Sequence, residues 1–280
     1  MSRFAGLAAL PPMRTLRLFG TCALVSALSC GGSGAVLRST ENRAVVELLS
    51  ENATTAHPAK ESSRIFPSFE QGSSSICPDS IIVDGCQLMD CPSPLPRSGK
   101  PSRAGTAVIS GGKLPISIPP RSTDYDWVQL PQRLWDGGET LQLAVGADVT
   151  PAFNLSIVAP SYIMVDEPVW PMGAAPLAIP RARDLAVTWS GGGAGFVAIE
   201  LQVTLDQGFY LANCTYPAAS GAGKVSARVL GTLPTGSASR LDISSVSLAE
   251  TQVSGWIMDF SAMAAANAPT GLASATFVLQ

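Results

Sequence analysis

Charged residues are scarce in this sequence of 280 residues, and histidine is almost absent. Asp, Glu, Lys and Arg make up 14% of the chain, against about 25% in an average globular protein. The 18 basic residues form no run, and the formal net charge is −3, which excludes nucleic-acid binding through phosphate contacts. The single histidine, His57, lies in a polar stretch, so most chemistry that depends on imidazole is excluded too.

Common enzyme motifs are also missing. The sequence has no G-x-S-x-G or H-E-x-x-H pattern. The glycine-rich segment 190–196 has Phe196 where a dinucleotide-binding loop needs its third glycine. The cysteines do not show the paired C-x-x-C spacing of zinc sites. We therefore expect neither a cofactor nor a metal.

Two acidic pairs are the candidates for carboxylate chemistry. They are Asp124 with Asp126, and Asp166 with Glu167. Either pair offers groups that a glycosidase or a calcium site uses, but neither has the spacing of a calcium-binding loop. The alternative interpretation is that these are solvated loop residues.

The N-terminus is typical of an export signal. Arg14 and Arg17 precede an apolar run at 18–29. A positive segment, a short apolar segment and small residues at its end predict a signal peptide over residues 1–29. The run is shorter than the roughly 20 residues of a transmembrane helix. Translation starts at Met1 or at Met13.

The end of this leader resembles the lipobox of bacterial lipoproteins. The matching residues are Ala27, Leu28, Ser29 and Cys30, with alanine where that family most often has leucine. The resemblance implies cleavage before Cys30 and attachment of a lipid to its sulfur. The protein would then be exported and anchored in the cell envelope, on the outer membrane or another periplasm-facing membrane. The alternative is an ordinary signal peptide cut elsewhere, with Cys30 in a disulfide.

Four more cysteines follow a polar stretch. Residues 30–75 predict a flexible tether, in which 41–50 could form a short amphipathic helix. Residues 76–104 form a disulfide-rich segment that packs on the later body. In an exported protein an even cysteine count predicts two disulfides, and one bridge must reach from this cluster into the body. Three connectivities are open among Cys77, Cys86, Cys91 and Cys214.

Residues 105–280 are expected to be an all-β domain. Short alternating runs recur between turn residues, and the clearest is 197–203. Gly111 and Gly112 separate two such runs and predict a hairpin, while 225–233 could hold one short helix. Roughly nine or ten short strands predict an antiparallel β-sandwich, immunoglobulin-like or jelly-roll-like, behind a disordered leader and tether.

Five tryptophans lie in this body. Trp189 and Trp256 fall inside strand patterns and are expected in the core. Trp135 and Trp170 lie in loops, so they are the candidates for an exposed aromatic platform that contacts a sugar or peptide. Core packing is the alternative for them as well.

The body also resembles a group of myxobacterial lipoproteins to which no activity is assigned. The resembling stretches are AGTAVISGG, WDGGETLQLAVGADVTPAF, DLAVTWSGG and NCTYPAASGAGKVSARVLGTLP. They span most of residues 100–280, and they imply a location and a style of fold rather than a reaction.

Two functions remain open. The first is a lipid-anchored, non-enzymatic module for binding, adhesion or envelope structure, attached to the membrane through its lipid and facing a protein or glycan partner. The second is a lipid-anchored hydrolase that uses two carboxylates on glycan or peptide, which requires acidic side chains about 5–10 Å apart.

Overall fold

A computed structural model describes most of the chain from residue 42 onward. The leader, Cys30, His57 and Asp124 lie outside the described residues. The described residues are 42–51, 61–72, 77, 79–92, 99–121, 125–171, 175–235, 238–269 and 271–280.

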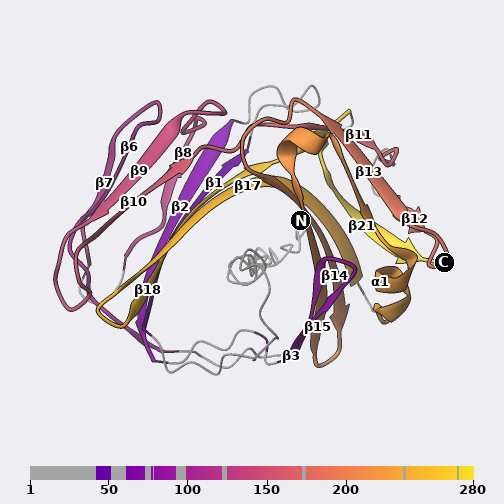
Figure 1. The fold of residues 1–280 in the computed structure, drawn as a ribbon, viewed down its shortest axis with the longest axis horizontal. Coiled ribbons are helices and arrows are strands. Elements are labelled where there is room, and N and C mark those ends of the chain that lie inside the picture. Colours follow the sequence, from indigo (N-terminus) through magenta and orange to yellow (C-terminus); the bar gives the residue numbers. More distant parts are fainter. Residues whose placement is uncertain are drawn as a thin grey trace, which may run out of the picture.

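A strongly curved sheet of twelve strands runs through the molecule (Figure 1). Nine strands follow one another from edge to edge, and the pairs are antiparallel except for β18 and β1, which are parallel. Their order is β3 (Asp79–Val83), β4 (Cys86–Pro92), β15 (Gly208–Pro217), β14 (Phe196–Leu205), β17 (Ala238–Val253), β18 (Trp256–Ala265), β1 (Asn42–Glu51), β2 (Ser62–Gln71) and β5 (Lys100–Pro101). Off this path, β8 (Val128–Leu130) pairs with β2, β21 (Ser274–Leu279) with β17, and β12 (Leu177–Ile179) with β21.

A four-stranded sheet covers the convex side of one half of the large sheet (Figure 1). Between the two layers lies a first core, to which β9 contributes Leu141 and Leu143 and β18 contributes Met258 and Phe260. Gly111 turns the chain between β6 and β7 as predicted, with φ at +86°, and a Cβ there would overlap the carbonyl oxygen of a neighbouring strand. The sheet order is β10 (Phe153–Val158), β9 (Thr140–Val145), β6 (Ala107–Ser110) and β7 (Ile116–Ile118).

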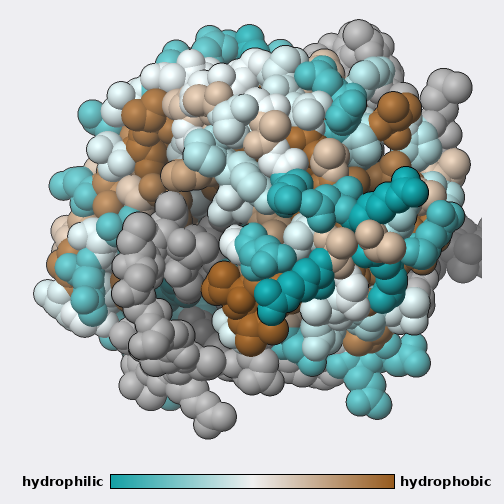
Figure 2. Space-filling model, turned by 45° about the vertical axis from the view of Figure 1, so that its right-hand side comes forward, coloured by the Kyte–Doolittle hydropathy of each residue, from teal (hydrophilic) through white to brown (hydrophobic). Residues whose placement is uncertain are grey.

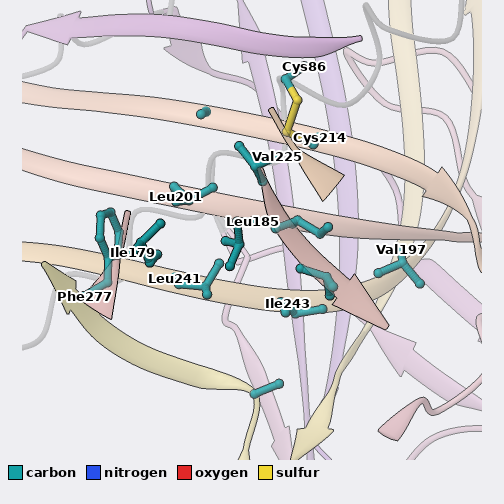
Figure 3. Packing of buried hydrophobic residues seen from close by; sticks show 14 of the residues in the cluster. Cys86, Ile179, Leu185, Val197, Leu201, Cys214, Val225, Leu241, Ile243 and Phe277 are labelled. Carbon is teal, nitrogen blue, oxygen red and sulfur yellow. A yellow bond between two sulfur atoms is a disulfide. The ribbon is translucent and has the colours of Figure 1, made fainter. Parts of the chain in front are cut away.

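A five-stranded sheet covers the convex side of the other half. The second core lies beneath it, where Leu185 of β13 and Val225 of β16 meet Leu201 of β14 and Leu241 of β17 (Figure 3). The short helix α1 (Ala227–Thr232) adds Leu230 to this core and falls within the predicted helical segment. The sheet order is β16 (Ala222–Val225), β13 (Leu185–Ser190), β11 (Met164–Glu167), β19 (Asn267–Ala268) and β20 (Gly271–Leu272).

The predicted all-β sandwich class is confirmed, and the strand over 197–203 is the centre of β14. The described residues contain twenty-one strand segments, more than the nine or ten expected. The twelve-stranded and five-stranded sheets are mixed, because β1, β12 and β19 each have a parallel partner, whereas the four-stranded sheet is antiparallel throughout. The body is therefore two β-sandwiches that share one large sheet.

The predicted tether over 30–75 is wrong for its described part. β1 and β2 lie inside the twelve-stranded sheet, and 41–50 is strand rather than helix from Asn42 onward. In β1, Ala44, Val46 and Leu48 alternate with residues of the opposite face and enter the first core. Sequence reasoning missed this two-residue alternation because the surrounding segment is polar. The second strand that pairs with β1 is β18, which lies more than 200 residues later in the chain.

Leu48→Ala tests whether this segment is structural. The side chain is fully buried, so its truncation is expected to lower the free energy of unfolding by about 2–5 kcal/mol. The matched control is Leu114→Ala, at an exposed leucine, with an expected loss below about 1 kcal/mol. Urea unfolding under non-reducing conditions measures both, and equal small losses would contradict the placement of β1 in the core.

Candidate functional site

The structure joins the four cysteines of the body in two disulfides. Cys77 pairs with Cys91 and Cys86 with Cys214, which confirms the two bridges and the link from the cluster into the body. Cys86 and Cys214 are direct neighbours on β4 and β15 and border the second core beside Val225 (Figure 3). Their bridge closes 128 residues, which stabilises the fold by about 5 kcal/mol in the chain-entropy model.

Of the two interpretations left open for Trp135 and Trp170, the exposed aromatic platform is wrong and core packing is confirmed. Trp135 is 0% exposed and Trp170 6% exposed. Trp135 belongs to the first core, and its indole N–H donates to the carbonyl of Pro160 at 3.1 Å. Trp170 belongs to the second core. Both loops fold back over a sandwich, which the loop position alone did not indicate.

The exposed tryptophan is Trp127, which is 58% exposed. It precedes β8 and stacks on Phe66 of β2, with 6.4 Å between ring centroids and 13° between ring planes. Elsewhere hydrophobic side chains form small separate groups among hydrophilic ones on the face shown in Figure 2. Sequence reasoning missed Trp127 because its exposure depends on how β8 pairs with β2.

The described members of the acidic pairs singled out from the sequence do not lie together. Asp126 is exposed and forms an ion pair with Arg121 at 2.8 Å. Asp166 and Glu167 are exposed on β11, in the five-stranded sheet that covers the other half of the molecule (Figure 1). These described carboxylates therefore do not converge on one substrate.

The concave face of the twelve-stranded sheet, the side away from both smaller sheets, carries the acidic residues that do gather. Successive residues of a strand point to opposite faces of the sheet. Residues that enter the cores therefore alternate with residues on the concave face along β1, β14, β17 and β18. The alternation places six carboxylates of these strands on the concave face: Glu47, Glu51, Glu200, Asp242, Glu250 and Asp259.

Four neighbouring strands present a polar residue at the same level of the concave face. Asp242 on β17 lies opposite Glu200 on β14, Glu200 lies opposite Asn213 on β15, and Asn213 lies opposite Gln87 on β4. We call these four residues the polar row. Strands in a sheet are about 4.8 Å apart, so each side chain of the polar row is within reach of the next.

Two members of the polar row are buried without a complete set of partners. Asn213 is 5% exposed and Gln87 is 7% exposed, and neither the Asn213 Oδ1 nor the Gln87 Oε1 has a hydrogen-bond partner. A buried polar atom without a partner costs about 1–3 kcal/mol, and such atoms are rare in folded proteins. The polar row thus holds buried acceptors that lack a donor.

The electrostatics of the polar row are set by burial and by like charge. Burial, and after it the negative charge of Asp242, raise the pKa of Glu200 from 4.5 to about 7, against the lowering effect of Arg240. Arg240 pairs with Asp242, with 2.6 Å from Nε to Oδ2. Glu47 also raises the Glu200 pKa, although β1 and β14 are not adjacent strands. The curvature of the sheet therefore brings distant carboxylates within electrostatic range.

A second group of charges lies further along the concave face. Arg43 of β1 donates from Nε to Asp259 Oδ2 of β18 at 2.7 Å. Burial raises the pKa of Asp259 above its usual value, although Arg43 and a hydrogen bond with Glu250 lower it. Glu250 is the direct neighbour of Asp259 on β17. Acid excess is thus a property of the whole face.

The described part of the chain contains no group of three or more His, Cys, Asp or Glu side chains that could hold a metal ion. It also contains no helix long and apolar enough to cross a membrane.

Comparisons with known proteins do not assign a family. No protein-family model matches the chain, and no curated protein matches it. Among solved structures, the chain is similar to the crystal structure of chicken CNTN1 FN1-FN3 domains, with 8% sequence identity, 66% of this chain and 72% of that chain covered, and a TM-score of 0.21. The fold assignment above therefore rests on the sheets themselves.

Glu200→Gln is expected to stabilise the protein in a pH-dependent way. The folded-state pKa is raised, so wild-type stability falls as the pH rises from about 4.5 to about 7, where only the unfolded state releases the proton. At pH 8 the variant should therefore be more stable by roughly 2 kcal/mol, with partial exposure of the side chain taken into account. At pH 4 the two proteins should be equal.

Urea unfolding at pH 4, 6 and 8 with intact disulfides measures this difference. Asp166→Asn, at an exposed carboxylate, is the control and should change stability by less than about 0.5 kcal/mol at each pH. A Glu200→Gln effect that is the same at pH 4 and pH 8 would show that burial does not raise this pKa.

Proposed function

We propose that this protein is an exported, lipid-anchored and non-enzymatic binding module, which holds its ligand against the concave face of the twelve-stranded sheet. The observation that carries the proposal is the polar row, in which the carbonyl oxygens of Asn213 and Gln87 are buried without a donor. In folded proteins such atoms are normally satisfied by protein, ordered water or ligand. A ligand that brings donors would remove the cost of leaving them unpaired.

The arrangement of layers supports this role for the concave face. Both smaller sheets and α1 pack on the convex side, where the two cores lie. The two large cores therefore do not need the concave face for their packing, although a small third cluster of Met89, Cys91 and Leu211 lies on it. The carboxylates of this face and the stacked pair of Trp127 and Phe66 lie outside the two large cores.

Export and anchoring are supported from a different direction. Two disulfides are typical of proteins that fold in an oxidising compartment. The lipobox resemblance at Cys30 adds the anchor, and the several acyl chains of a mature lipoprotein give lasting membrane attachment where one chain would not.

One observation favours a carboxylate-dependent hydrolase as the second candidate. Glu200 and Asp242 are direct cross-strand neighbours, a spacing of about 5 Å that matches the nucleophile and acid of retaining glycosidases. The pKa of Glu200 at about 7 would suit a general acid. Against this role, Asp242 is already paired with Arg240 at 2.6 Å, which weakens it as a nucleophile.

The intact mass of membrane-extracted protein tests the anchor. We expect a chain that begins at Cys30 and carries acyl groups, with four cysteines that become alkylated only after reduction. Cys30→Ala should move the protein from the membrane fraction to the soluble fraction. A wild-type mass without lipid, or one that begins at another residue, would contradict the anchor.

The hydrolase alternative is tested with envelope glycan and peptide fractions at pH 5 to 8. A binding module is expected to release no product above the background of Glu200→Gln protein. Product release by the wild type that Glu200→Gln and Asp242→Asn both abolish, while Asp166→Asn retains it, would favour the hydrolase instead.

A further inference from the structure

We propose that the polar row binds a primary ammonium group, carried by a polyamine or by a lysine side chain of a polypeptide. This inference rests on the proposed role of the concave face as a ligand-binding surface, and it names the chemistry that the face recognises.

The available groups of the polar row are acceptors. The carboxylate of Glu200 lies between Asp242 and Asn213, and Gln87 follows on the next strand. Asp242 is already paired with Arg240. Three acceptors therefore remain side by side: the Glu200 carboxylate, the Asn213 Oδ1 and the Gln87 Oε1, the last two buried and unpaired. An ammonium group has three N–H donors and no acceptor, which matches this set in number and in sign.

Other donors fit the polar row less well. A guanidinium presents a flat fork that suits the two oxygens of one carboxylate, whereas these acceptors come from three side chains on successive strands. A hydroxyl group has one donor and would leave acceptors unpaired. Calcium requires six to eight oxygens, more than the three acceptors that remain in the polar row.

The charge around the polar row also favours a cation. Asp242 from β17 and Glu47 from β1 face Glu200 together with one positive group, Arg240. Burial and these two negative charges resist ionisation of Glu200, and a bound ammonium would relieve that cost. Affinity is therefore expected to depend on the protonation of Glu200.

Calorimetric titration of the full chain at pH 8 tests the proposal. The probes are 1,5-diaminopentane for a free polyamine and Nα-acetyl-lysine amide for a lysine side chain, with 1,5-pentanediol as the neutral match and calcium chloride as the metal alternative. We expect one amine site, no binding of the diol, and at least a tenfold loss of amine affinity in Glu200→Gln. The preferred amine identifies the source of the ammonium group.

Asn213→Leu keeps the size of the side chain and removes the unpaired carbonyl, so it is expected to fold and to bind amine at least fivefold more weakly. The control Asp166→Asn should bind within twofold of wild type.

In the wild type, affinity should fall about tenfold from pH 8 to pH 6 as Glu200, with a pKa of about 7, becomes protonated.

Equal binding of the diol, displacement of amine by calcium, or unchanged amine affinity in both variants would overturn the proposal. The absence of amine binding by a protein whose extracted mass still shows the lipid at Cys30 overturns this inference alone. The absence of both overturns the proposed function as well.

Discussion

The backbone pairing of β17 is the constraint on which the other parts of the structure depend. This strand of sixteen residues pairs with β14 along its first half and with β18 along its second half. The residues of β17 on the convex face contribute to both cores. Leu241 and Ile243 belong to the second core, and Ala249 and Val253 pack against the first. Two sandwiches that would otherwise be separate units therefore share one continuous sheet.

The shared sheet determines which residues lie on each of its two faces. The convex face is occupied by the two cores, so polar residues of the same strands fall on the concave face. A protein with only 14% charged residues places six carboxylates of four strands there. The curvature of the sheet is strong enough for Glu47 to influence Glu200 from a strand that is not its neighbour. The polar row lies on this face with buried acceptors, and the proposed function assigns these acceptors to a ligand.

Local pattern predicted the elements whose structure is decided locally. The alternation through Val197, Ile199 and Leu201 predicted β14, and Gly111 predicted the hairpin of β6 and β7. The disulfide link to Cys214 followed from the cysteine count of a chain that was expected to be exported. These features depend on short-range stereochemistry or on chemistry that the compartment dictates.

Features decided by distant partners were missed. β1 looked like part of a tether because its partner β18 lies more than 200 residues away. Trp135 looked exposed because its burial depends on Pro160 and Tyr162, which close over it. Glu200 stood out only as a polar residue of an alternating strand, since its neighbours Asn213 and Gln87 are known only once the register of β14, β15 and β4 is known. The candidate site exists because the register of these strands places polar residues beside one another.

The most direct measurement of this arrangement is the titration of the Glu200 side-chain carboxyl carbon by NMR, with the signal assigned from Glu200→Gln. An enclosed polar row predicts a midpoint near pH 7, at about the value that burial and Asp242 impose, and a lower midpoint when 1,5-diaminopentane is added. A midpoint near 4.5 that the diamine does not move would contradict an enclosed, cation-binding concave face.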